Sequence, residues 1–244
     1  MASSCTLSIA ELRERFPNFR VAFVVVDEID IPASPPPELD AWIADTVAQA
    51  AAALSGPELG NLPVLKCWRE AYKAFGEKKT SYRSSVERLL KGIQRGNGLP
   101  RVNAFVDAYN AVSVRYRMPV GADDLDLVTP PLAFRYSRKD DSFIALGDPI
   151  GADDPPKPRE VVYADGAKCL CRRWNWYQDA RSAIRPATTR RAVLTIQSNC
   201  AETAGQVEAA AELLCRRIGG ACGGSTAWAI ADASTPEVTL TADS

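Results

Sequence analysis

The segment Val102–Met118 constrains the fold most, because it carries two separate rows of residues at helical spacing. Apolar residues recur every three or four positions, which predicts a helix that buries one face. Asn103, Asp107 and Asn110 form a polar row along the same helix. Segments rich in β-branched residues, such as Arg20–Val26, lie before and after this helical centre and are predicted to be strands. The arrangement favours an α+β fold.

Periodicity and turn residues predict the remaining elements. Further helices are expected over residues 8–15, 38–54, 63–75, 84–94 and 203–218. Strands are expected over residues 132–136, 143–146, 160–163, 168–176, 191–197 and 226–231, with the first two and the next two paired as hairpins. The chain after residue 234 is expected to be frayed. Because no repeat and no clear linker interrupts the chain, residues 1–244 are predicted to form a single domain.

The complete absence of histidine limits the chemistry of any site. A Ser-His-Asp triad, a Cys-His dyad and a histidine metal ligand are all excluded. The seven cysteines are irregularly spaced and include no C-x-x-C motif, so neither a disulfide framework nor a zinc site is expected. We interpret them as small buried residues of a reducing compartment. No metal and no cofactor are expected.

The net charge of −1 hides two basic segments. Residues 66–101 carry ten basic and three acidic side chains, and residues 168–191 carry seven basic and one acidic side chain. If both segments fold onto one face, that face would attract a polyanion. The alternative is that these lysines and arginines are scattered over solvated surfaces.

Two features bear on the location of the protein. The N-terminal residues lack a basic region followed by an apolar region, so no secretory signal is expected. The apolar run Val21–Val26 is too short to cross a bilayer. These features predict a cytoplasmic protein that does not act at a membrane.

Several motifs resemble, in order and spacing, the B3/B4 domain of the phenylalanyl-tRNA synthetase β subunit. The main motif is Val106–Asp126, where the matching positions are Asp107, Asn110, Val112, Pro119, Ala122, Asp124, Leu125 and Asp126. Freestanding homologues of that domain are similar over four shorter stretches, residues 68–76, 81–85, 162–166 and 171–176. Together the resemblance covers about residues 62–194, and the N- and C-terminal α/β elements are expected to pack on that family-like core.

The resemblance implies a three-layer fold, with mainly antiparallel sheets flanked by helices and a central pocket. In the synthetases that pocket hydrolyses mischarged tyrosyl-tRNA(Phe), and the freestanding copies look like trans-editing proteins. This chain departs from the family pattern at Gly121, where the family has a histidine, and at Asp123, where it has an aromatic residue. Asp179 lies near the position of the family's acidic residue that senses tyrosine. The class II synthetase motifs are not visible, so the chain is not expected to be a tRNA ligase by itself.

An editing site can work without histidine, because the ester at the 3′ end of a charged tRNA is already activated. Hydrolysis then needs mainly a positioned water and stabilisation of the oxyanion. Asn103, Asp107 and Asn110 are the candidate catalytic residues. Asp107 can accept a hydrogen bond from an ammonium or hydroxyl group, and the two asparagines can orient a carbonyl or a water. The alternative is that Asp107 and Asn110 satisfy backbone groups of nearby loops.

Two motifs are candidates for binding substrate or tRNA. Tyr82, Arg83 and Ser84 precede a predicted helix, whose first N–H groups can bind an anion together with Arg83. An ordinary N-cap at Ser84 is the alternative. The second motif interleaves cations with aromatic rings that can stack a base, and consists of Arg172, Arg173, Trp174, Asn175 and Trp176. One of these tryptophans is expected in the core and the rest near the site.

Three functions remain open. The leading hypothesis is a trans-editing aminoacyl-tRNA hydrolase, with tRNA or aminoacyl-tRNA as its partner and an amino-acid-like molecule in the pocket. The second is a non-catalytic module that binds tRNA, other RNA or an amino acid, which the loss of histidine at Gly121 favours. The third is an enzyme recruited to small-molecule biosynthesis. No specificity for DNA is indicated.

Overall fold

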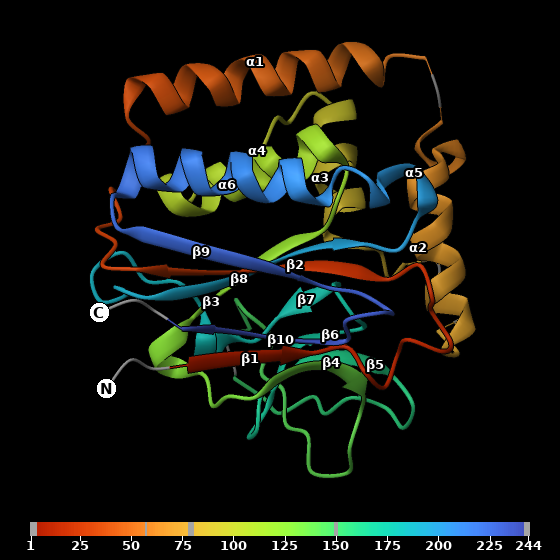
Figure 1. Cartoon of the computed structure of the whole chain (residues 1–244). Helices are drawn as coiled ribbons and strands as arrows, with labels where there is room; N and C mark the ends of the chain where they lie inside the picture. Colours follow the sequence, from red (N-terminus) through yellow and green to blue (C-terminus); the bar gives the residue numbers. More distant parts are fainter. Residues whose placement is uncertain (1–3, 57, 78–80, 149–150, 242–244) are drawn as a thin grey trace.

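The computed structural model describes residues 4–56, 58–77, 81–148 and 151–241. Its strands form a four-stranded and a six-stranded sheet. Figure 1 shows a layer of helices above the four-stranded sheet and the six-stranded sheet beneath it. The α+β class and the three layers are therefore confirmed.

The four-stranded sheet lies in the middle of the molecule and is wholly antiparallel. Its strand order is β3 (Val120–Asp124), β8 (Ala192–Ser198), β2 (Arg20–Asp27) and β9 (Ser225–Ala231). β2 is buried at every position from Val21 to Val26, because helices cover one face of the sheet and the other sheet covers the opposite face. A strand covered on both sides needs apolar residues at consecutive positions, which is the pattern of its sequence.

The six-stranded sheet is antiparallel except for one parallel pair, β1 with β4. Its order is β10 (Glu237–Thr241), β1 (Ser4–Ser8), β4 (Leu132–Tyr136), β5 (Val161–Ala164), β6 (Cys169–Arg172) and β7 (Tyr177–Gln178). The predicted hairpin of β5 and β6 is confirmed. Its turn is held by Asp165, whose carboxylate accepts hydrogen bonds from the N–H groups of Ala167 and Lys168, both at 2.7 Å.

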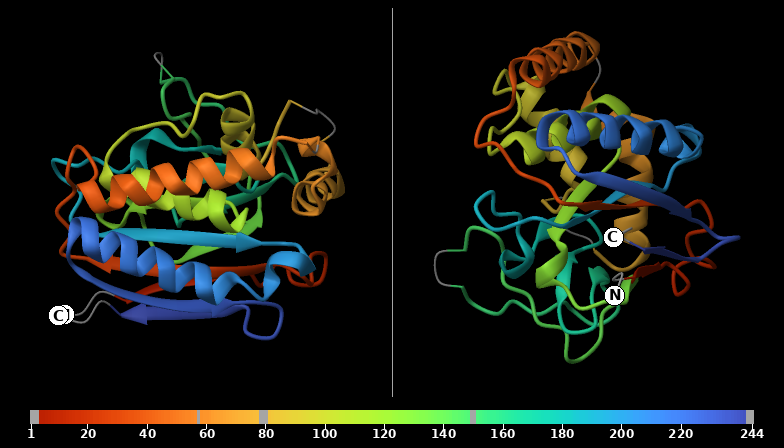
Figure 2. Two further views of the ribbon diagram at one scale, coloured as in Figure 1. Left: turned by 90° about the horizontal axis from the view of Figure 1, so that it is seen from above. Right: turned by 60° about the vertical axis from the view of Figure 1, so that its left-hand side comes forward.

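The helices are α1 (Pro37–Ala53), α2 (Pro63–Ala74), α3 (Ser85–Gln94), α4 (Ala104–Tyr116), the short α5 (Ala201–Ala204) and α6 (Val207–Cys222). α4 contacts α1, α6 and β3, and the views of the helical layer in Figure 2 show the same neighbours around it. Because α4 has neighbours on several sides, its polar row is buried along with its apolar row.

Four predicted elements are wrong in whole or in part. The strand expected over residues 168–176 ends at Arg172, because residues 173–176 form a turn. The residues after Ser8 form turns and not a helix, because Ser8 ends strand β1. Residues 143–146 do not form a hairpin with 132–136, because β4 instead pairs with β1 and β5. The C-terminal segment is not frayed as far as residue 241, since β10 pairs with the full length of β1, and residues 242–244 lie outside the described part of the chain.

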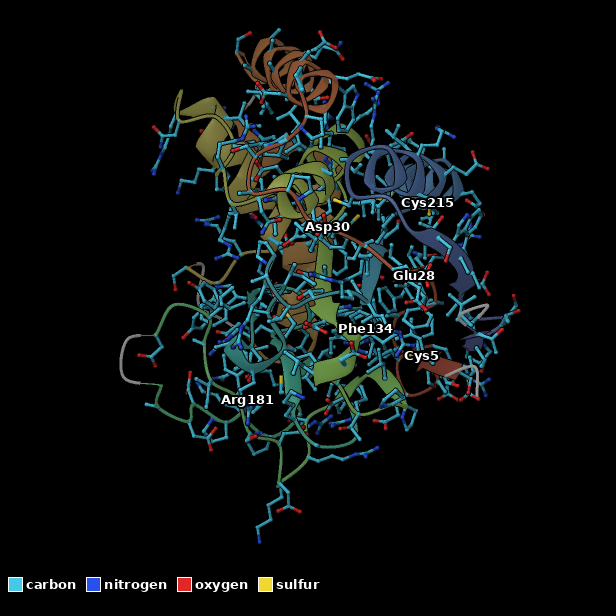
Figure 3. The ribbon with its side chains drawn as sticks, turned by 90° about the vertical axis from the view of Figure 1, so that its left-hand side faces the viewer. Cys5, Glu28, Asp30, Phe134, Arg181 and Cys215 are labelled. Carbon is cyan, nitrogen blue, oxygen red and sulfur yellow. The ribbon has the colours of Figure 1, made fainter. Side chains whose placement is uncertain are left out.

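A cluster of aromatic rings fills the space between the two sheets. The ring of Phe134 from β4 stacks on Tyr163 from β5, with their centroids 4.7 Å apart, and meets Phe19 edge-on at 5.2 Å. Figure 3 shows Phe134 in the interior of the molecule. No helix among the described residues is long and apolar enough to cross a membrane.

Candidate functional site

A cavity of about 680 Å³ lies where α3 and α4 meet the ends of both sheets. Tyr109 and Asn110 of α4 line one side, and β3 lines it from Val120 to Asp123. Asn175 and Trp176, from the turn between β6 and β7, also line it. The central helix and the tryptophan-bearing segment therefore converge on one cavity.

Asp123 is a buried carboxylate in the wall of this cavity. It accepts hydrogen bonds from the Ser182 hydroxyl at 2.7 Å and from Nε2 of Gln178 at 3.2 Å. Both donors are neutral, so they offset only part of the cost of burying a charge. Desolvation by burial raises the pKa of Asp123 to about 7. A carboxyl group that changes charge near neutral pH inside a cavity is a candidate for direct contact with a ligand.

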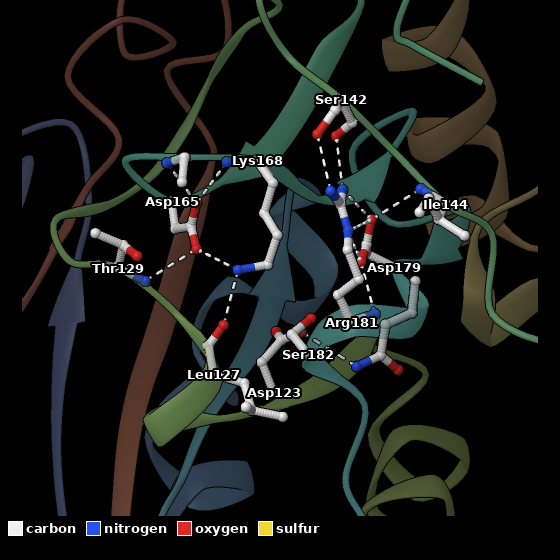
Figure 4. Close-up of polar contacts among 12 residues, drawn as sticks. Asp123, Leu127, Thr129, Ser142, Ile144, Asp165, Lys168, Asp179, Arg181 and Ser182 are labelled. Atoms are coloured by element: carbon white, nitrogen blue, oxygen red, sulfur yellow. Dashed lines mark hydrogen bonds and ion pairs between the residues drawn. The ribbon is translucent and has the colours of Figure 1, made fainter. Parts of the chain in front are cut away.

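Two ion pairs flank Asp123 and Ser182, and Figure 4 shows them on either side. Lys168 pairs with Asp165 at 2.8 Å, and Arg181 pairs with Asp179 at 2.7 Å. The charge of Lys168 lowers the pKa of Asp123 and the charge of Asp179 raises it, but both effects are smaller than that of burial. The pKa of Asp123 therefore stays raised although two ion pairs lie beside it.

Tyr163 supplies an unused polar group at the same cavity. Its hydroxyl oxygen is buried and has no hydrogen-bond partner among the described residues. Burial raises the pKa of Tyr163 well above its ordinary value, and the charge of Asp123 raises it further. The hydroxyl therefore stays protonated. An unpartnered buried hydroxyl is costly unless a water or a ligand satisfies it.

A chain of hydrogen bonds fixes a third part of the wall. The Tyr72 hydroxyl donates to Oδ1 of Asn175 at 2.9 Å, and Nδ2 of Asn175 donates to Gln197 at 3.0 Å. Gln197 in turn donates to the Thr195 hydroxyl at 3.1 Å. One N–H and one lone pair of the Asn175 amide are thus used to hold its turn against β8.

The turn that carries Asn175 has an unusual backbone. Arg173 and Trp174 have φ values of 47° and 67°, which are uncommon for residues with large side chains. Trp174 is fully buried, and its ring meets those of Phe16 and Trp68 edge-on at 4.7 Å and 5.3 Å. This packing stabilises the backbone conformation that brings Asn175 and Trp176 to the cavity.

One cation at the cavity has no carboxylate partner among the described residues. Arg88 of α3 lines the cavity, and its guanidinium lies over the Tyr177 ring, 5.0 Å from the centroid. Arg88 is exposed and makes no ion pair within the part of the chain that the structure describes. It can therefore meet an anionic group of a ligand.

The three predicted catalytic residues do not share one environment. Asn110 lines the cavity. Asn103 caps the N-terminus of α4, where its side chain accepts from the Val106 N–H at 2.9 Å. Asp107 pairs with Arg101 at 2.8 Å and accepts the Val102 N–H at 2.8 Å. As a correction, Asn103 and Asp107 do not line the cavity, because loop and helix N–H groups and Arg101 use their oxygen atoms.

The arginines of the second motif are buried in ion pairs. Arg172 pairs with Glu160 at 2.9 Å, and Arg173 pairs with Glu77 at 3.2 Å. The Arg173 guanidinium also contacts the rings of Tyr82 and Trp176, 3.7 Å and 4.4 Å from their centroids. Neither arginine is available to a phosphate at the surface, which corrects the expectation that this run contacts RNA directly.

The remaining predicted residues have mainly structural contacts. Ser84 is the N-cap of α3, and Arg83 pairs with Glu87 one turn further on. Asp179 is fully buried, caps the short helix η3 (Ala180–Ser182) and pairs with Arg181. As expected, one tryptophan of the motif lies in the core, Trp174, and the other, Trp176, lines the cavity.

Three residues of the cavity were not predicted from the sequence to belong to a site: Asp123, Tyr163 and Arg88. The only signal for Asp123 was a charged residue where the family pattern has an aromatic one. Tyr163 and Arg88 carry no local signal, because a tyrosine in a buried strand and an arginine on a helix are both ordinary. The described residues contain no group of three or more histidine, cysteine, aspartate or glutamate side chains placed to hold a metal.

Comparisons with known proteins gave one family match and a weak structural match. A family model described as the B3/4 domain matches residues 67–209. Among solved structures, an N-terminal fragment of the phenylalanyl-tRNA synthetase β-subunit from Pyrococcus horikoshii matches with a TM-score of 0.47 and 11% sequence identity. That match covers 92% of this chain and 51% of the fragment, so the chain spans about half of the fragment's length. No curated protein sequence matches.

Proposed function

Because the chain belongs to the B3/4 domain family, we propose that it hydrolyses aminoacyl-tRNA carrying the wrong amino acid, without an attached synthetase. The observation that carries this proposal is the cavity beside Asn110, with a buried carboxylate and an unpartnered hydroxyl in an aromatic wall. Its volume of about 680 Å³ lies in the range of small-molecule sites, about 300–1,000 Å³. An amino acid with a polar or aromatic side chain fits such a site.

The cavity residues divide into two roles. Asp123 accepts a hydrogen bond from a donor group of the bound amino acid, and the Tyr163 hydroxyl donates to an acceptor of the same ligand. Asn110, on α4, orients the ester carbonyl or the attacking water. Asp123 and Tyr163 therefore select the amino acid, and Asn110 acts at the ester.

The reaction needs no imidazole. The water oxygen bonds to the ester carbonyl carbon and gives a tetrahedral oxyanion, which N–H groups can stabilise. The bond between that carbon and the ribose oxygen then breaks, and the ribose oxygen takes up a proton that the water loses. The products are the free amino acid and a tRNA with its terminal hydroxyl restored.

The test is release of amino acid from tRNA. We expect faster deacylation of tyrosyl-tRNA(Phe), or of another mischarged tRNA, than in buffer alone. Asp123→Asn should lower kcat/KM about tenfold or more, because a hydrogen bond to a charged group contributes about 1.5–3 kcal/mol. Asp126→Asn is the matched control, since Asp126 is an exposed carboxylate that does not line the cavity. No acceleration with any charged tRNA would refute the proposal.

Gly121 favours a second candidate, a non-catalytic module that binds an amino acid or RNA. A β-carbon at Gly121 would meet no atom within 4 Å, so the wall of the cavity is open at this position. A site that has lost a side chain where its family has histidine can keep a ligand and lose turnover. Saturable binding of tyrosine or tRNA, measured by calorimetry together with no deacylation, would favour this candidate. An amino-acid-derived molecule that copurifies with the protein would instead favour an enzyme of small-molecule biosynthesis.

A further inference from the structure

A second cavity, of about 490 Å³, lies on another side of α3. The connection between α1 and α2 forms one wall, including Leu59 and Gly60, and α3 forms the other, including Lys91 and Arg95. Arg69 of α2 and Arg83, just before α3, complete it. We call it the basic cavity, because four cationic side chains line it: Arg69, Arg83, Lys91 and Arg95.

The positive charge in the basic cavity exceeds the negative charge. Glu87 is almost fully buried and is shared by two arginines, with Arg69 Nη2 at 2.6 Å and Arg83 as its second partner. Glu58 is the other carboxylate of the lining, and it is exposed. Within the described part of the chain, Lys91 and Arg95 form no ion pair. Among the described lining residues, the cavity therefore keeps two positive charges that no carboxylate neutralises.

The geometry around Arg69 keeps its guanidinium at the cavity. Both Nε and Nη2 of Arg69 donate to Glu87, at 3.2 Å and 2.6 Å. A β-carbon at Gly60 would come within 2.9 Å of Nη1 of Arg69, so the guanidinium packs closely against the backbone of Gly60. A guanidinium held in this way loses little conformational freedom when it binds an anion, and its planar shape matches phosphate.

One helix separates the basic cavity from the first cavity, beside Asn110 and Trp176, which we call the aromatic cavity. α3 presents Arg88 and Gly92 to the aromatic cavity, and it presents Lys91 and Arg95 to the basic cavity. A helix with its side chains is about 10–12 Å across. A stacked nucleic-acid strand advances about 3.4 Å per nucleotide. About three nucleotides therefore span the distance between the two cavities.

We propose that the basic cavity binds a phosphodiester of the RNA strand whose 3′ end enters the aromatic cavity. The proposal rests on the proposed function for the direction of the strand and for the nature of its terminal group. The strand crosses α3 past Arg88, and its backbone phosphates meet Lys91 and Arg95. The first basic segment of the sequence, and not the second, is then the electrostatic contact with RNA.

The experiment measures how RNA binding depends on salt. A fluorescein-labelled single-stranded RNA with the sequence of a tRNA 3′ end is titrated with protein at several salt concentrations, and binding is followed by anisotropy. Each phosphate neutralised in a single strand contributes about −0.7 to the slope of log K against log salt. We expect the double variant Lys91→Gln, Arg95→Gln to bind about tenfold more weakly, with a slope smaller by about 1.4.

Arg13 and Arg15 provide the matched control. Both are exposed arginines on the turn after β1, away from both cavities, and they form no ion pair among the described residues. The double variant Arg13→Gln, Arg15→Gln removes the same charge and should bind RNA like the wild type. Equal slopes for the two double variants would overturn the proposal. A second result would also overturn it. The variant Lys91→Gln, Arg95→Gln, which we call the cavity variant, would lose binding of inorganic phosphate in a thermal-shift assay but keep the wild-type slope with RNA.

A separate measurement distinguishes this proposal from the proposed function. Cleavage of tyrosine methyl ester, which has no phosphate, reports on the aromatic cavity alone. If the wild type cleaves neither charged tRNA nor the methyl ester, the hydrolase proposal fails. The phosphate site still stands in that case, provided that the cavity variant shows the smaller slope with RNA. If charged tRNA is cleaved, the cavity variant should show a raised KM for it.

Discussion

Two buried aspartates, Asp107 and Asp123, show how the surroundings of a residue decide its role. Asp107 receives a guanidinium from Arg101 and a backbone N–H from Val102. Asp123 receives only the neutral donors of Ser182 and Gln178. Charged and neutral donors compensate burial to different extents. Asp107 therefore serves as a structural carboxylate, whereas Asp123 has a pKa raised to about 7 and faces a cavity.

The raised pKa of Asp123 predicts how stability depends on pH. Between about pH 4 and pH 7 the folded protein holds a proton that the unfolded chain has released. The free energy of unfolding therefore falls as pH rises through this range, by at most about 1.4 kcal/mol per pH unit from this group. Asp123→Asn should remove this contribution. The measurement is urea unfolding at pH 5, 6, 7 and 8 for the wild type and the variant.

Other carboxylates make the free energy of unfolding rise with pH. The test therefore uses the difference in free energy of unfolding between the wild type and Asp123→Asn at each pH. Arg135 and the Arg138 N–H lower the pKa of Asp141 against its burial, and this stability is lost as pH falls. The Asp126→Asn variant controls for a general change of charge. A wild-type curve that stays parallel to the Asp123→Asn curve from pH 5 to pH 8 would contradict the prediction.

At the scale of elements, the turn between β6 and β7 depends on distant packing. Its left-handed residues Arg173 and Trp174 are not glycine or asparagine, so no local propensity favours this turn. The Trp174 ring instead packs against aromatic residues from the segment before β2 and from α2. The core therefore sets the turn, and the turn sets the position of Asn175 and Trp176 at the cavity.

Removing the Trp174 ring should both destabilise the fold and loosen the site. We expect Trp174→Ala to lower the free energy of unfolding by about 3–5 kcal/mol, the usual cost of deleting a buried aromatic side chain. Trp228→Ala is the control, because Trp228 lies half-buried on the edge strand β9 and should cost much less. Urea unfolding followed by circular dichroism measures both. Equal losses for the two variants would show that Trp174 has no special structural role.

At the scale of the whole molecule, the two ends of the chain close one sheet. β10 pairs with β1 over five residues, from Ser4 with Thr241 to Ser8 with Glu237. β1 is also the strand that joins β10 to the rest of the six-stranded sheet, through its parallel pairing with β4. The segment expected to be frayed therefore protects an edge that carries the buried residues Cys5 and Leu7.

Truncation tests this closure. A chain that ends at residue 233 lacks β10 and exposes the backbone of β1 as a new sheet edge. We expect a lower melting temperature and more aggregation, measured by thermal unfolding and light scattering. Thr239→Ala, which removes only the exposed hydrogen bond between Thr6 and Thr239, should change the melting temperature little. A truncated protein as stable and soluble as the full chain would show that β10 contributes nothing.

The sequence by itself determined most helices and strands and the fold class, because these follow from local periodicity, caps and turns. α4, the Ser84 cap and the hairpin of β5 and β6 are examples. Short strands such as β3 and β10 escaped detection, because their stability comes from pairing with distant strands and not from their own pattern.

Only the tertiary structure decided which polar residues face the cavity. Asp107 and Asn110 lie one helical turn apart on α4, yet Asn110 alone lines the cavity. Arg173 finds its partner Glu77 nearly a hundred positions away, which removes it from the surface. Burial and pairing are set by neighbours that the fold brings together, so residue type and spacing identify candidates for a site, whereas three-dimensional packing selects among them.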